Sequence, residues 1–191
     1  MQLTSRFEEA LVYASRLHAR QFRKGSEIPY VTHLLSVTGI ALAYGANEDA
    51  AIAALLHDAV EDQGGAPTLA EIRARFGENV AAIVDGCTDT DVVPKPPWRA
   101  RKEAYIAHVR KASASIRLVS ASDKLDNARA ILGDYRIVGE ALWGRFKGGR
   151  EGTLWYYSEL VKAFQDAGGG PLVEELERVV AELRRLAAGH E

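Results

Sequence analysis

The sequence has 191 residues, of which 47% are hydrophobic, and a formal net charge of −2, so it is long enough for a domain with a substantial core. The nearly balanced charge excludes the class of strongly basic proteins that bind nucleic acid or membranes through the electrostatic field of the whole protein. A small charged ligand would have to be bound by local clusters of charged residues. A single cysteine, Cys87, excludes an internal disulfide, and no stretch reads as a signal peptide or a membrane span, so the sequence predicts a cytoplasmic protein.

Three helices are predicted in the first third of the chain. Apolar residues at three- and four-residue steps indicate an amphipathic helix over about residues 5–22, capped by Ser5. Pro29 suits the first turn of a second helix over about residues 30–44. Residues 50–56 are strong helix formers and almost wholly apolar, which is typical of a buried helix, and Asn47 is expected to cap it.

Shorter elements are predicted in the middle of the chain. Thr68 followed by Glu71 is a capping-box pattern, which predicts a short helix that ends at Phe76 before Gly77. Another apolar segment covers residues 80–84. Residues 88–97 are mostly polar residues and prolines, so we expect an irregular loop there, either a mobile flap beside a binding site or a plain surface excursion.

The second half of the chain is also predicted to be helical. Ser113 or Ser115 is expected to cap a helix over residues 116–132, whose first half is apolar except for serines. No alternating strand pattern and no internal repeat occurs, so the predicted class is all-α, a helical bundle. It would form a single domain over residues 1–191, with its core at about residues 5–165. The remaining helices are expected over about residues 98–111, 140–146, 152–167 and 171–188.

An unusual group of polar residues follows the buried helix. His57, Asp58, Glu61 and Asp62 stand at offsets that, at about 100° per residue, fall within a sector of roughly 140°. Three carboxylates on one face repel one another unless a cation holds them, and a hard divalent metal ion fits this mixture of nitrogen and oxygen ligands. The stretch therefore predicts a metal site, and the alternative is a solvated helix end with a histidine in the core.

Two other helices carry polar residues that look buried. His33 lies one turn into the second helix, and Asp123 lies in the apolar part of the helix over residues 116–132. The core of a helical bundle can bring these residues together with His57 and Asp58. Two imidazoles and two carboxylates, completed by water, suit Mn²⁺ best, and Zn²⁺, Co²⁺ and Mg²⁺ are alternatives.

The order of these residues is that of the HD phosphohydrolase superfamily, and five sequence words closely resemble the hydrolase domain of the RelA/SpoT family. The words are HARQFRKG (18–25), IPYVTH (28–33), AALLHDAVED (53–62), FG (76–77) and ASDKLDN (121–127). The resemblance covers about residues 5–165 and implies an HD-domain bundle that removes the 3′-pyrophosphate from ppGpp or pppGpp, which leaves GDP or GTP. Because the chain ends before any synthetase or regulatory domain, it resembles a stand-alone small alarmone hydrolase.

The resemblance also implies which side chains bind the metal and act in the reaction. Glu61 and Asp62 match an acidic pair that is implicated in catalysis, and they lie close enough to the ligands to orient water or transfer a proton. The manganese ligands that it implies are His33, His57, Asp58 and Asp123.

Several polar and cationic residues are candidates to bind the substrate. By resemblance, Arg23 would lie against the base, Lys24 near a phosphate and Asn127 near the ribose. Lys147 and Arg150 flank two glycines in a turn whose backbone amides would be accessible, so Lys147 is a candidate phosphate contact. A plain turn between two helices is the alternative reading of that segment.

Two other functions remain open on the sequence alone. An HD phosphohydrolase that acts on ppApp, on the 2′-phosphate of NADPH or on a nucleoside 5′-monophosphate would share the same metal and acidic groups. A non-catalytic nucleotide-binding module is the other alternative, although it would have little reason to keep carboxylates crowded without a metal. In each case the expected partner is a small nucleotide, not a nucleic acid or a membrane, and the oligomeric state is open.

Overall fold

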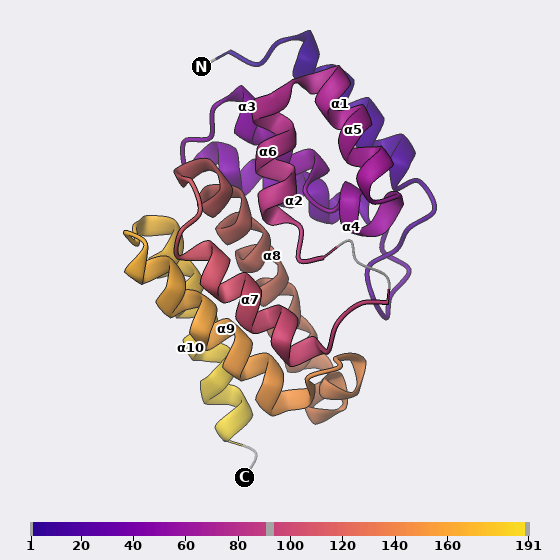
Figure 1. Cartoon of the computed structure of the whole chain (residues 1–191). Coiled ribbons are helices and arrows are strands. Elements are labelled where there is room, and N and C mark those ends of the chain that lie inside the picture. Colours follow the sequence, from indigo (N-terminus) through magenta and orange to yellow (C-terminus); the bar gives the residue numbers. More distant parts are fainter. Residues whose placement is uncertain (1, 91–93, 190–191) are drawn as a thin grey trace. The chain divides into compact units, whose positions relative to one another are not determined.

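The computed structural model describes residues 2–90 and 94–189. Within these residues the chain is helical, with an isolated antiparallel β-bridge between Phe22 and Pro29, so the predicted all-α class is confirmed (Figure 1). None of the described helices is long and apolar enough to cross a membrane. The helices are, in order, α1 (Ser5–Leu17), α2 (Val31–Ala43), α3 (Glu48–Leu56), α4 (Ala59–Gln63), α5 (Ala66–Phe76), α6 (Glu78–Cys87), α7 (Trp98–Val109), α8 (Ala114–Val138), the 3₁₀ helix η1 (Gly139–Arg145), α9 (Gly149–Asp166) and α10 (Pro171–Ala188).

Contacts between residues divide the chain into two compact units. The first unit comprises Met1–Lys95 and Ala112–Ser122, and the second comprises Pro96–Lys111 and Asp123–Glu191. Helix α8 therefore begins in the first unit and continues in the second. The single domain that we expected over residues 1–191 stays a prediction.

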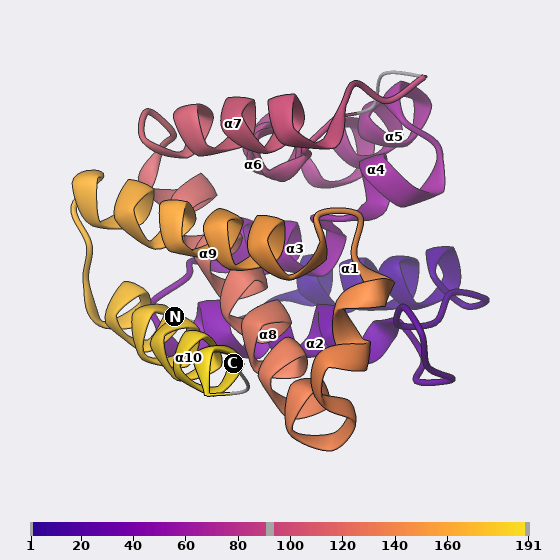
Figure 2. The ribbon, with the colours of Figure 1, turned by 90° about the horizontal axis from the view of Figure 1, so that it is seen from below.

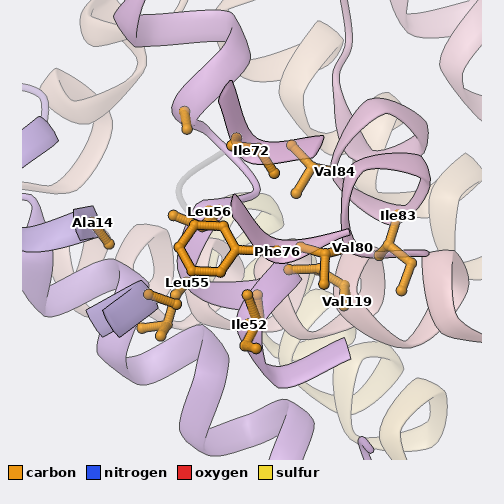
Figure 3. Close-up of a cluster of buried hydrophobic side chains, with 14 of the residues drawn as sticks. Ala14, Ile52, Leu55, Leu56, Ile72, Phe76, Val80, Ile83, Val84 and Val119 are labelled. Atoms are coloured by element: carbon orange, nitrogen blue, oxygen red, sulfur yellow. The ribbon is translucent and has the colours of Figure 1, made fainter. Parts of the chain in front are cut away.

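The core of the first unit is built around α3. All residues from Ala50 to Leu56 are buried, as expected from their composition, and α3 contacts α1, α2 and α6. Leu56 belongs to one apolar cluster with Phe76 of α5 and Val80 of α6 (Figure 3). Burial of each of these large side chains contributes about 1.5–3 kcal/mol. This packing fixes the end of α3, where His57 follows.

In the second unit, α9 is the central helix. It contacts α7, α10 and η1, and it lies between α7 and α10 (Figure 2). Leu160 and Phe164 of α9 and Leu176 and Leu183 of α10 are fully buried or nearly so. The two helices are thus held together by apolar packing, and the bounds of α10 agree with the prediction of a helix over residues 171–188.

The first helix is shorter than predicted. Thr4, not Ser5, caps α1, because its side-chain oxygen accepts a hydrogen bond from the amide of Arg6. The helix ends at Leu17 instead of near residue 22. Phe22 then pairs with Pro29, so the chain turns back on itself before α2 begins. The apolar steps of the sequence did not reveal this end, because Ala19 and Phe22 continue the helical pattern.

The predicted sector of side chains assumed that the acidic stretch continues the buried helix, and this assumption is wrong. Asn47 caps α3 as expected, with its side chain accepting a hydrogen bond from the amide of Ala50 at 2.9 Å. However, α3 ends at Leu56, and α4 starts as a separate short helix after Asp58. His57 and Asp58 are therefore the two residues that join these helices.

The capping box predicted at Thr68 is wrong. Helix α5 already begins at Ala66, with Pro67 in its first turn, where a missing amide proton is tolerated. Thr68 lies inside the helix, and its hydroxyl donates a hydrogen bond to the carbonyl of Gln63 at 3.0 Å. Gly77 separates α5 from α6 with a φ of 92°, a conformation that glycine adopts readily.

The remaining elements differ from the prediction mainly at their ends. Ser113 accepts a hydrogen bond from the amide of Ile116, which supports Ser113 as a cap, and α8 continues to Val138 instead of ending near residue 132. The segment predicted as a helix over residues 140–146 is the 3₁₀ helix η1. Residues 88–90 and 94–97 are irregular, as expected, and residues 91–93 of that loop lie outside the described residues.

Candidate functional site

The structure brings together three of the four predicted metal ligands. His33 of α2 and the joining residues His57 and Asp58 each offer one ligand atom, and these atoms lie within 4.8 Å of one another. Asp58 Oδ2 lies 3.0 Å from His57 Nε2 and 3.5 Å from His33 Nε2. Both imidazoles are buried, whereas the Asp58 side chain is 22% exposed, so Asp58 is the one of the three that solvent contacts.

The protonation of His57 suits a metal ligand. Its Nδ1 lies 2.9 Å from the carbonyl oxygen of Ala54, which can only accept, so Nδ1 carries a proton, and in the neutral ring Nε2 presents its lone pair. That lone pair faces the carboxylate oxygen of Asp58 at 3.0 Å. Two electron-rich atoms at this distance attract each other only through a proton or a metal ion. The donor set therefore fits a divalent cation, and the role of these residues as ligands stays a prediction.

Tyr30 contacts two of the candidate ligands, and the sequence reasoning did not single it out. Its hydroxyl donates a hydrogen bond to Asp58 Oδ2 at 2.6 Å. Its ring stacks on His18, with centroids 5.4 Å apart, and meets the edge of His33 at 5.5 Å. Tyr30 therefore positions the carboxylate and packs between two histidines. The signal was present, since Tyr30 stands in one of the five sequence words that resemble the RelA/SpoT hydrolase domain.

Glu61 and Asp62 lie in the first turn of α4, in the same unit as the three candidate ligands. Glu61 Oε1 accepts a hydrogen bond from the ammonium of Lys95 at 2.8 Å. Asp62 Oδ2 accepts one from the amide of Gln21 at 2.7 Å. Asp62 is exposed as a residue, but its carboxyl group is partly buried. This burial is the main cause that raises the pKa of the carboxyl, and repulsion from Asp58 is the second. The sequence reasoning identified neither Lys95 nor Gln21.

Arg23 and Lys24 occupy the turn between α1 and α2. The amide of Arg23 donates to the carbonyl of Ile28 at 2.8 Å, next to the bridge between Phe22 and Pro29. The same turn leads directly to Tyr30. Both cations belong to the first unit, which also contains Glu61 and Asp62. Their contacts with base and phosphate stay predictions.

Asp123, the fourth predicted ligand, belongs to the second unit and begins the second of its two segments. Its carboxylate is held from two sides, by the ammonium of Lys124 at Oδ2 and the amide of Asn127 at Oδ1. The last contact shows that Asp123 and Asn127, four residues apart, share a helix face. Burial, the largest single effect, acts to lower the pKa of Lys124. The charge of Asp123, the interactions with Tyr156 and Tyr105 and the hydrogen bond to Asp123 together outweigh it and hold that pKa well above its usual value. Asp123 as a ligand and Asn127 as a ribose contact stay predictions.

Lys147 is exposed in the turn before α9. The two glycines that follow it have separate causes. A Cβ atom on Gly148 would lie 2.7 Å from the ring of Trp98, and Gly149 has a φ of 59°, a conformation that favours glycine. Arg150 donates a hydrogen bond to the carbonyl of Ala187 at 2.6 Å. Gly148 thus leaves room for an indole ring, and a phosphate contact by Lys147 stays a prediction.

Comparison with known proteins was made on both sequence and structure. Residues 10–152 match the HD domain family. Guanosine-3′,5′-bis(diphosphate) 3′-pyrophosphohydrolase MESH1 of Xenopus tropicalis is 40% identical over 124 residues, which are 63% of this chain and 66% of that protein. MESH1 of Drosophila melanogaster is 35% identical over 129 residues, 66% of this chain and 69% of that protein.

A longer relative and two solved structures extend the comparison. The guanosine-3′,5′-bis(diphosphate) 3′-pyrophosphohydrolase of Aquifex aeolicus is 32% identical over 68% of this chain, but the match spans only 18% of that protein. The structure described as a metazoan ortholog of SpoT that hydrolyzes ppGpp aligns with a TM-score of 0.79 and 27% identity, over 96% of this chain and 98% of that one. The structure of lmo0812 from Listeria monocytogenes aligns with a TM-score of 0.71 and 30% identity, over 80% of this chain and 99% of that one.

Proposed function

This chain belongs to the HD domain family, and we propose that it is a metal-dependent hydrolase that removes the 3′-pyrophosphate from ppGpp or pppGpp, with GDP or GTP and pyrophosphate as products. The observation that carries the proposal is the group of His33, His57 and Asp58, whose ligand atoms lie within 4.8 Å of one another. The similarity to MESH1 proteins and to the structure of a ppGpp-hydrolysing SpoT ortholog supports the choice of substrate.

We propose that His33, His57 and Asp58, with Asp123 as the fourth ligand, hold the metal ion. Imidazole nitrogen and carboxylate oxygen together suit Mn²⁺ best among the divalent ions considered. A divalent ion at this position lowers the pKa of water and polarises a phosphoryl oxygen. The buried hydrogen bond from His57 Nδ1 to Ala54 and the hydrogen bond from Tyr30 to Asp58 orient two of the ligands.

The acidic pair is proposed to move protons during the reaction. A carboxyl group with a raised pKa holds its proton longer, so Asp62 is suited to give a proton to the ribose 3′ oxygen as that oxygen leaves phosphorus. Glu61, held by Lys95 at 2.8 Å, is suited to orient the attacking water. The two carboxylates thus take different roles because their neighbours differ.

The remaining contacts are proposed for substrate recognition. Arg23 stacks against the base, Lys24 and Lys147 each meet a phosphate, and Asn127 meets the ribose. The planar guanidinium of Arg23 suits stacking on a base, while ammonium groups suit the concentrated charge of phosphates. The proposal places the protein in the cytoplasm with a small nucleotide as its partner.

Two variants test the metal site. Asp58→Ala and Asp123→Ala should each lose manganese binding and turnover together, because each removes a proposed ligand. Asp166→Ala is the matched control, since Asp166 forms an exposed ion pair with Arg110. Calorimetric titration with Mn²⁺ reads the binding without any substrate. Wild-type manganese affinity in Asp123→Ala would remove that residue from the ligand set.

A panel of substrates tests the reaction. The purified protein is offered ppGpp, ppApp, NADPH and a deoxynucleoside monophosphate in parallel, with Mn²⁺ and with a chelator. Manganese-dependent release of pyrophosphate from ppGpp supports the proposal. Release of phosphate from another substrate, with ppGpp untouched, would keep the metal site and overturn the choice of substrate, and no turnover of any of the four would favour a binding module.

A further inference from the structure

We propose that Gln21 is a positioning residue that aims the carboxylate of Asp62, and that His18 sets the direction of the Gln21 amide. Nothing in the reaction proposed above assigns a role to either residue. The inference rests on the proposed function only in that it takes Asp62 as a catalytic group. All three residues belong to the first unit.

The Gln21 amide can have only one orientation. Its oxygen lies 2.7 Å from His18 Nδ1 and 2.5 Å from the amide nitrogen of Gln63, while its nitrogen lies 2.7 Å from Asp62 Oδ2. With the amide reversed, its oxygen would face the ionised carboxylate oxygen of Asp62, and this contact would be repulsive. The donor of Gln21 therefore points at Asp62, and the Gln63 amide is compatible with this orientation.

This orientation fixes the state of His18. Since the Gln21 oxygen can only accept, His18 Nδ1 must carry the proton. The opposite nitrogen, Nε2, is buried without a hydrogen-bond partner. A second proton there would be a buried, unsatisfied charge, and burial indeed lowers the pKa of His18. His18 is therefore a neutral donor with a single polar task.

The network does not exist simply to fill space. His18 is only 2% exposed and stacks on Tyr30 with an angle of 20° between the rings. A phenylalanine would fill the same place without burying an unsatisfied nitrogen, which costs about 1–3 kcal/mol. The polar atom that His18 does use, Nδ1, acts on Gln21. Its chemical purpose is thus to hold the amide.

The hydrogen bond from Gln21 restricts the side-chain conformation of Asp62. Because it is exposed, its side chain would otherwise sample several rotamers, and a catalytic group acts efficiently only from one geometry. The hydrogen bond from Gln21 selects one rotamer. It also occupies Oδ2, which leaves Oδ1 to carry the proton that Asp62 donates.

Three substitutions separate positioning from packing. Gln21→Met keeps the length of the side chain and removes the amide. His18→Phe keeps the stacked ring and removes the donor, whereas His18→Asn places an amide NH₂ group where Nδ1 stands. Gln165→Met is the matched control, because Gln165 makes a similar surface hydrogen bond to Glu177 at 3.0 Å.

Steady-state kinetics on ppGpp give the first test. Gln21→Met and His18→Phe should each lower kcat by about 10- to 100-fold, as expected for the loss of a group that orients a reacting residue, with KM little changed. The double variant should be no slower than Gln21→Met alone, because both remove the same interaction. His18→Asn should recover most of the activity, and Gln165→Met should equal the wild type. Wild-type kcat in Gln21→Met, or equal losses in His18→Phe and His18→Asn, would overturn the proposal.

A measurement without substrate keeps this inference separate from the proposed function. The ¹⁵N NMR signals of the His18 ring should show a proton on Nδ1 and none on Nε2 at pH 7.5, and the Gln21 side-chain amide signals should shift in His18→Phe but not in Gln165→Met. A proton on Nε2, or unshifted Gln21 signals, would overturn the network. If ppGpp is not hydrolysed at all, the proposed function fails, and the NMR result still decides the orientation of Gln21.

Discussion

The hydroxyl of Tyr30 lies 2.6 Å from Asp58 Oδ2, the same oxygen that His57 Nε2 approaches at 3.0 Å. One carboxylate oxygen thus accepts a hydrogen bond from the Tyr30 phenol and also faces Nε2, the atom through which His57 would bind a metal. A hydrogen bond to a carboxylate of this kind fixes its direction and its charge before a cation arrives.

Removal of that hydroxyl should weaken metal binding. We expect Tyr30→Phe to lower the affinity for Mn²⁺ about 10- to 100-fold, the usual effect of losing a group that orients a metal ligand. Calorimetric titration measures this directly. Tyr135→Phe is the control, since it removes a phenol that donates to Glu140 in the second unit. Equal manganese affinity in Tyr30→Phe and the wild type would show that Asp58 does not need the phenol.

Glu61 should matter for the reaction but not for the metal. Glu61→Gln keeps the size of the side chain, removes its charge and weakens its contact with Lys95. We expect manganese affinity to stay as in the wild type and kcat to fall by about 10²–10⁴-fold, the range for a group that assists proton transfer. Titration with Mn²⁺ and steady-state kinetics on the same preparation measure both. Wild-type turnover by this variant would remove Glu61 from the mechanism.

Gly148 is required by the ring of Trp98. In Gly148→Ala the new Cβ would meet Trp98 at 2.7 Å, and that ring is held by contacts with Trp155 and Tyr156. Overpacking of this kind costs about 1–3 kcal/mol. Urea unfolding of the variant should show this loss in the free energy of unfolding. Gly144→Ala, where no atom lies within 4 Å of the new Cβ, should lose clearly less, and similar losses in both variants would argue against the packing explanation.

Much of the fold followed from sequence patterns, and the exceptions have physical causes. Buried Ala50–Leu56 and the cap at Asn47 were predicted well, because composition and a local hydrogen bond determine them. The end of α1 at Leu17 was missed, since the β-bridge between Phe22 and Pro29 depends on residues apart in sequence. The capping box at Thr68 failed because Pro67 can start α5 earlier.

For the site, types of residue were predicted better than contacts. The sequence indicated that His33 and His57 would meet Asp58, because a bundle core can join polar groups from separate helices. It did not reveal Tyr30 or Lys95. Their roles arise from hydrogen bonds to Asp58 and Glu61 across 28 and 34 residues of chain, and no local pattern encodes such pairs.

The stability of the protein should depend on the protonation of His18. Burial lowers its pKa in the folded state below the ordinary value of 6.5, so the unfolded chain binds more protons below that pH. His18 therefore stabilises the fold fully above pH 6.5, and the free energy of unfolding should fall as the pH drops below it. Urea unfolding between pH 8 and pH 5, with a chelator present, measures this dependence. His18→Asn should show a smaller decrease, and an identical decrease in both proteins would place the effect on other groups.

The most direct measurement of the central claim is product analysis of ppGpp after incubation with the protein and Mn²⁺ in water enriched in ¹⁸O. We predict GDP and pyrophosphate as products, with the ¹⁸O in the pyrophosphate, because water attacks the phosphorus attached to the ribose 3′ oxygen. A chelator should abolish the reaction. Release of single phosphates, ¹⁸O in the nucleotide, or equal turnover with the chelator would contradict a metal-dependent 3′-pyrophosphohydrolase.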